Sequence, residues 1–96
     1  MIRRKAVELG DLIRQFLRAE GLETPLNEYR AVRSWAEIAG PTIQKYTGDV
    51  FVKNGILNIK IKSPALRQNL NFNRMVFAQR INEHVGAQVI TEVRFY

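Results

Sequence analysis

The sequence of 96 residues predicts one α+β domain of two layers, a three-stranded sheet with helices packed on one face. Three observations lead to this fold class. Two alternating segments flank an Asn-Gly pair at residues 54–55, which is a strong hairpin signal. A third alternating segment covers residues 89–96, and helical repeats of apolar residues fill most of the rest. The expected order is α-α-(short α)-β-β-α-β, with residues 1–96 as a single domain.

The first two helices are expected over residues 9–20 and 25–39. In the first, the spacing i, i+3, i+4, i+7, i+8 forms one apolar stripe, which we expect to face the core. The members of that stripe are Leu9, Leu12, Ile13, Phe16 and Leu17. Pro25 opens the second helix and Gly40-Pro41 ends it, with a short helical turn over 42–46. Trp35 lies on the apolar stripe of the second helix, so a core position is favoured over a surface stacking role.

The hairpin is expected over residues 49–53 and 56–62. A two-residue turn at Asn54-Gly55 pairs Lys53 with Ile56 and, further along, Phe51 with Asn58. One face of the hairpin is then apolar and comprises Val50, Val52, Leu57, Ile59 and Ile61. The other face combines one aromatic ring with three lysines and comprises Phe51, Lys53, Asn58, Lys60 and Lys62.

A third long helix is expected over residues 64–85. Ser63 provides a capping hydroxyl, Pro64 suits the first helical position, and Gly86 suits the residue after the end. The strand over 89–96 should then pair with the hairpin, because an isolated two-stranded hairpin is marginally stable.

The charge balance points to an anionic partner. Fifteen lysines and arginines against nine acidic residues give a net charge of +6, which favours nucleic acid, an acidic protein face or an anionic surface. Candidate phosphate contacts are Lys53, Lys60 and Lys62 on the hairpin, Arg67 on the following helix, and Arg3, Arg4 and Lys5 in a basic leader expected to be flexible. Phe51 is the candidate stacking ring. The alternative is an ordinary solvated face whose lysines discourage strand-to-strand aggregation.

The sequence offers no case for catalysis. It has no cysteine, one histidine (His84) near the end of a predicted helix, and six scattered glycines that form no phosphate loop. Metal-ligand spacing is absent, so we expect no enzyme activity, no cofactor and no small-molecule substrate. No apolar run reaches the ~18 residues of a membrane span, and the first residues lack the apolar segment of a secretory signal. We therefore expect no membrane partner and a cytoplasmic location.

Several segments together resemble the DciA family of bacterial replicative-helicase loaders. The resemblance rests on five segments: 9–13 (LGDLI), 35–41 (WAEIAGP) with Tyr46-Thr47, 55–59 (GILNI), 63–70 (SPALRQNL) and 81–83 with the last strand. It covers almost the whole chain and looks like the short, domain-only form of the family. The combination of W-x-x-I-x-G-P with a later S-x-A-L-R-x-x-L carries most of the specificity.

The resemblance implies a KH-like domain that binds the DnaB-type helicase and single-stranded DNA, and assists helicase loading without hydrolysing ATP. Two departures matter. Many relatives carry a disordered basic C-terminal tail, which these 96 residues lack, so we expect either weaker DNA affinity or DNA binding from the folded surface. No two glycines are three residues apart, so the GXXG loop of RNA-binding KH domains is missing. A KH-like RNA-binding module and a pure protein–protein adaptor remain the alternatives.

Overall fold

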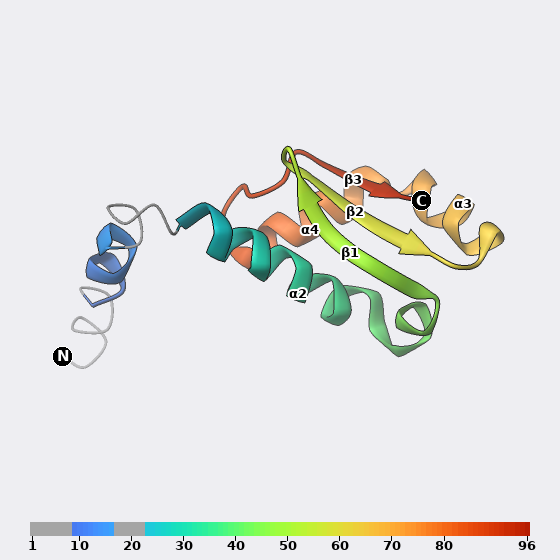
Figure 1. The fold of residues 1–96 in the computed structure, drawn as a ribbon, viewed down its shortest axis with the longest axis horizontal. Helices are drawn as coiled ribbons and strands as arrows, with labels where there is room; N and C mark the ends of the chain where they lie inside the picture. The colour runs from blue at the N-terminus through green and yellow to red at the C-terminus, as the bar shows by residue number, and fades with distance from the viewer. Residues whose placement is uncertain (1–8, 17–22) are drawn as a thin grey trace.

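The computed structural model describes residues 9–16 and 23–96, and Figure 1 shows its arrangement. Residues 9–16 are helical. The other elements are α2 (Glu23–Lys45), β1 (Thr47–Lys53), β2 (Ile56–Ile61), α3 (Pro64–Phe72), α4 (Arg74–Val85) and β3 (Glu92–Phe95). The strand order in the sheet is β1-β2-β3, with β1 antiparallel and β3 parallel to β2. The predicted α+β class and three-stranded sheet are confirmed.

The hairpin has the predicted turn and register. Asn54 and Gly55 have φ angles of 53° and 76°, the positive values that a two-residue turn of type I′ requires. Phe51 lies opposite Asn58 and Lys53 opposite Ile56. The register shifts between Thr47 and Val50, so that β1 carries an irregularity at its start.

Helix α2 is kinked where the sequence predicted an end. Gly40 has φ 80° and ψ 173°, which is non-helical, and the helix resumes at Pro41 and runs to Lys45. This conformation is essentially restricted to glycine, and the proline that follows cannot donate a backbone hydrogen bond. The Gly-Pro pair therefore turns the chain toward β1 without a separate loop.

The predicted single helix over 64–85 is wrong, because the chain breaks into α3 and α4 at Asn73. This residue has φ −108° and ψ 17°, and its N–H donates to the carbonyl of Leu70 at 3.0 Å. Three asparagines at 69, 71 and 73 weaken the helix here, since their side chains compete for backbone hydrogen bonds. The break lets α3 pack against β2 and β3 while α4 packs against α2 and β3.

The core lies between the sheet and the helices α2 and α4. Its buried members are Ala31, Trp35, Leu57, Ile59, Ile61, Leu70, Ala78, Ile81, Ile90, Val93 and Phe95. Trp35 is only 1% exposed, which confirms the predicted core position. Its ring lies 5.5 Å from that of Phe77 and 5.4 Å from that of Phe95, centroid to centroid, and its Nε1–H donates to Thr47 Oγ1 at 3.3 Å. An aromatic cluster therefore ties α2, α4 and β3 together.

The apolar stripe of the first helix is not part of this core. Leu9, Leu12, Ile13 and Phe16 are each more than half exposed, so the prediction that they face the core is wrong, while Leu17 lies outside the described residues. Periodicity reports that a helix is amphipathic and does not report what covers the apolar side. This helix therefore presents an apolar stripe on the surface.

Candidate nucleic-acid interface

The face of the sheet opposite α2 and α4 is open and carries polar and aromatic side chains. Strand alternation sends every second residue to this face. On β2, Leu57, Ile59 and Ile61 are buried while Lys60 between them is exposed. We call the outward-pointing set the open sheet face, and its members are Asp49, Phe51, Lys53, Ile56, Asn58, Lys60, Glu92, Arg94 and Tyr96.

Two aromatic rings meet on the open sheet face. Phe51 comes from β1 and Tyr96 directly follows β3, with β2 between these strands. Their ring centroids are 6.3 Å apart and the ring planes are inclined at 69°. Phe51, Asn58, Arg94 and Tyr96 line a shallow hollow of about 250 Å³. The two outer strands thus build a small aromatic site around a residue of the central strand.

Backbone and side-chain hydrogen bonds hold this hollow in place. The N–H of Tyr96 donates to the carbonyl of Ile59 at 3.0 Å, and its carbonyl accepts from the N–H of Ile61 at 2.8 Å. The Nδ2 of Asn58 donates to the carbonyl of Ile56 at 3.0 Å. This bond leaves Oδ1 of Asn58 as an acceptor beside the guanidinium of Arg94.

Lys60 reaches the open sheet face over a glycine. A Cβ atom on Gly48 would lie 3.2 to 3.3 Å from three carbons of the Lys60 side chain, so the aliphatic stem rests against the glycine backbone. A stem supported in this way keeps its ammonium group in solvent. Gly48 lies at the irregular start of β1, which brings its backbone close to β2.

The structure gathers three of the predicted contact residues and separates the others. Phe51, Lys53 and Lys60 share the open sheet face. Lys62 is exposed just beyond β2, where its N–H donates to the carbonyl of Tyr46 at 2.8 Å. Arg67 lies on α3 and lines a different hollow with Pro64, Gln68, Asn71 and Phe72. Arg3, Arg4 and Lys5 lie outside the described residues.

Sequence reasoning missed Asn58, Arg94 and Tyr96 as site residues. The signal for the last two was present in the alternation of the final strand, where Val93 and Phe95 are buried and Arg94 and Tyr96 exposed. The alternation alone did not show which strand β3 pairs with. Because β3 pairs with β2, with Arg94 opposite Asn58, these side chains join the same row as Phe51.

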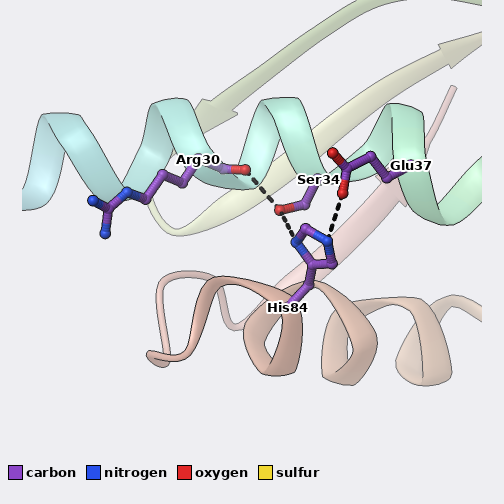
Figure 2. Close-up of polar contacts among 4 residues, drawn as sticks. All are labelled: Arg30, Ser34, Glu37 and His84. Carbon is purple, nitrogen blue, oxygen red and sulfur yellow. Dashed lines mark hydrogen bonds and ion pairs between the residues drawn. The ribbon is translucent and has the colours of Figure 1, made fainter. Parts of the chain in front are cut away.

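A second polar cluster joins α2 to α4 on the helical side of the domain, and Figure 2 shows it. Ser34 Oγ lies 3.0 Å from Nδ1 of His84, and Nε2 of His84 lies 2.6 Å from a carboxylate oxygen of Glu37. Ser34 also donates its hydroxyl proton to the carbonyl of Arg30 at 2.7 Å. The sequence had linked His84 to the helix end alone, whereas its ring bridges two helices.

This Ser-His-Glu arrangement connects two helices and differs from the arrangement around a catalytic serine. In a catalytic serine, the hydroxyl proton passes to the imidazole and Oγ faces the substrate. Here Ser34 is only 3% exposed and its proton is directed to a backbone carbonyl. The cluster therefore acts as a clasp between α2 and α4.

In residues 9–16 and 23–96, no three His, Asp or Glu side chains come together in a way that could hold a metal ion. No helix within those ranges combines the length and the apolar character needed to cross a bilayer.

Comparison with known proteins bears on the whole chain. The family model described as "Dna[CI] antecedent, DciA" matches residues 8–95. The chain is also 28% identical, over 93 residues, to a "UPF0232 protein" of Corynebacterium glutamicum (strain R). That alignment covers 97% of this chain and 52% of the relative, so the chain spans about half the length of the relative.

Proposed function

This chain belongs to the DciA family, and from that premise we propose that it is a DNA-replication adaptor that binds the replicative DnaB-type helicase and single-stranded DNA. In this role it assists loading of the helicase and performs no chemistry of its own. The family match spans residues 8–95, which includes every element of the sheet and its helices. Because the curated relative is about twice as long, the activity of the whole protein is also part of the proposal.

The open sheet face is the observation that carries the DNA-binding half of the proposal. It presents two aromatic rings, a guanidinium and two lysines on one side of the sheet, as Phe51, Tyr96, Arg94, Lys53 and Lys60. Proteins that bind single strands combine aromatic stacking platforms with cations that follow the phosphate backbone. Helices cover the opposite face of the sheet, so the open sheet face is the one accessible to a ligand.

Charge supports the same assignment. The chain carries a net charge of +6, and a polyanion gains affinity from such a surplus through release of its counterions. On the open sheet face the stem of Lys60 rests against Gly48, which supports its ammonium in solvent. We propose that Lys53, Lys60, Lys62 and Arg94 contact phosphates and that Arg67 adds a contact from α3.

A pure protein–protein adaptor is the second candidate, and one observation favours it. The helix at residues 9–16 exposes an apolar stripe of four large side chains, and exposed apolar stripes commonly mark protein-binding surfaces. In that case the lysines of the open sheet face and Lys62 would contact an acidic face of the helicase, and DNA binding would be incidental. Charge reversal at Lys60 and Lys62 would then abolish helicase binding whether or not DNA is present.

Fluorescence anisotropy with labelled single-stranded DNA across a salt series tests the DNA-binding half. The proposal expects saturable binding at low salt that weakens as salt rises, with a log–log slope of roughly −0.7 for each phosphate neutralised. Four to six contacts would give a slope of roughly −3 to −4. Binding that is absent at low salt would contradict this half of the proposal.

A further inference from the structure

We propose that the hollow between Phe51 and Tyr96 binds one unpaired nucleobase of a single strand, an inference that rests on the proposed DNA-binding function. The proposed function requires only that cations of this surface meet phosphates. The further step is that a base leaves the strand's own stack and enters a defined site. The site comprises the four residues that line the hollow: Phe51, Asn58, Arg94 and Tyr96.

The shape of the hollow suits a single planar ring system. Its volume of about 250 Å³ falls just below the roughly 300–1,000 Å³ of sites that enclose whole small molecules. The rings of Phe51 and Tyr96 are 6.3 Å apart at 69°. A base stacked on the face of one ring therefore places its edge toward the other, an arrangement that aromatic groups favour.

The polar groups of the hollow match the edge of a base. The Nδ2 of Asn58 is engaged by the carbonyl of Ile56, so its Oδ1 is presented as an acceptor. The guanidinium of Arg94 supplies donors from the neighbouring strand, opposite Asn58 in the register. The Watson–Crick edge of every base carries at least one hydrogen-bond donor and one acceptor, and that edge is free only in single strands.

The cations are placed for the flanking phosphates. Lys53 follows Phe51 by two residues on β1, and Lys60 follows Asn58 by two residues on β2. Since residues two apart on a strand lie on the same face, roughly 7 Å from each other, each lysine follows a lining residue of the hollow on the open sheet face. A strand whose base enters the hollow keeps its backbone within reach of these lysines. The site therefore selects unpaired strands over duplexes without reading their sequence.

The test compares ordinary and abasic strands, because both carry the same phosphates. Two labelled strands of about twelve nucleotides, within the range that single-strand binding folds cover, are titrated with the 96-residue chain at one salt concentration. One is oligothymidylate and the other carries abasic sugars throughout. The inference expects about tenfold tighter binding of the thymidine strand, the contribution typical of one stacked base. An abasic strand with one central thymidine should recover most of that factor.

Substitutions test whether the tenfold difference in affinity between the two strands arises in the hollow. Phe51→Leu keeps an apolar side chain but removes the ring, and is expected to reduce the tenfold ratio to about twofold, whereas Tyr96→Phe keeps both rings and should preserve it. Lys60→Gln is expected to weaken both strands equally and leave the ratio unchanged. Circular dichroism and thermal melting establish that each variant is folded.

The outcomes separate this inference from the proposed function. Equal affinity of the wild-type protein for abasic and ordinary strands would overturn base binding while leaving DNA binding through phosphates in place. If the folded Phe51→Leu variant still binds the thymidine strand tenfold more tightly than the abasic strand, the base binds elsewhere and the inference is overturned. Failure to bind either strand at low salt would contradict the DNA-binding function itself.

Discussion

Ser34 of α2 and His84 of α4 lie 3.0 Å apart, from Oγ to Nδ1, and this contact joins the two helices. The single hydroxyl proton of Ser34 is donated to the carbonyl of Arg30, so Oγ accepts from Nδ1–H. The other ring nitrogen, Nε2, lies 2.6 Å from a carboxylate oxygen of Glu37, also on α2. Through these contacts the ring of His84 connects α4 to two residues of α2 (Figure 2).

Replacing His84 should loosen this clasp measurably but modestly. His84→Ala is expected to lower the free energy of unfolding by about 1 kcal/mol, since it removes two hydrogen bonds, one of them to a carboxylate that is largely solvent-exposed. Urea denaturation followed by circular dichroism measures the change. Arg80→Ala, at an exposed site on the same helix, is the control and should stay within about 0.5 kcal/mol of wild type. Equal stability of the two variants would contradict the clasp.

Gly40 should be intolerant of a side chain. Gly40→Ala is expected to cost about 1–3 kcal/mol of stability, because φ 80° with ψ 173° is a conformation that residues with a Cβ rarely adopt. The loss arises from the backbone, since no atom beyond the adjacent residues and the helix's own backbone lies within 4 Å of where the Cβ would be. Gly10→Ala in the helix at 9–16 is the matched control and should cause no loss, as alanine favours a helix interior. A Gly40→Ala variant as stable as wild type would show that the kink is not required.

Trp35 should be among the most costly residues to truncate. Trp35→Ala is expected to lower the free energy of unfolding by about 3–5 kcal/mol, because it opens a cavity between α2, α4 and β3 and leaves Thr47 without the indole donor. Phe72→Ala removes an aromatic ring that is 80% exposed, and should change stability by less than about 0.5 kcal/mol. Thermal and urea denaturation followed by circular dichroism compare the two variants. Similar losses in both would contradict the placement of the core.

Lys60 should contribute to DNA binding through position as well as charge. Lys60→Gln is expected to weaken single-stranded DNA binding and to reduce the magnitude of the log–log salt slope by about 0.7. Arg80→Gln removes the same charge from α4, on the helical side of the domain, and should leave the slope nearly unchanged. Anisotropy titrations at four or more salt concentrations measure both slopes. An equal reduction in the two variants would show that net charge alone determines binding.

Local sequence signals predicted the hairpin and the kink well. Asn54-Gly55 and Gly40-Pro41 each require backbone angles that few other residues adopt, so turn and kink follow from residue identity. The break at Asn73 was missed because an apolar stripe can be drawn across it. Only the packing of α3 and α4 against different partners shows that the chain changes direction there.

The sequence predicted only the part of the candidate site that lies on the hairpin. Alternation within the hairpin placed Phe51, Lys53 and Lys60 on one face, because their register depends on a turn no more than five residues away. Arg94 and Tyr96 joined that face through parallel pairing with β2, a contact more than thirty residues distant in sequence. The exposure of the stripe at residues 9–16 was likewise beyond local patterns, since it depends on which elements pack against that helix.

A pull-down of the replicative helicase from the same bacterium tests the central claim most directly. Immobilised wild-type chain and the Lys60→Glu/Lys62→Glu variant are each incubated with purified helicase, with and without single-stranded DNA. The adaptor function predicts that both proteins retain the helicase without DNA, and that only the wild type also retains DNA. Helicase that binds neither protein would contradict the helicase-adaptor function. If only the variant fails to retain the helicase, Lys60 and Lys62 contact the helicase instead of DNA.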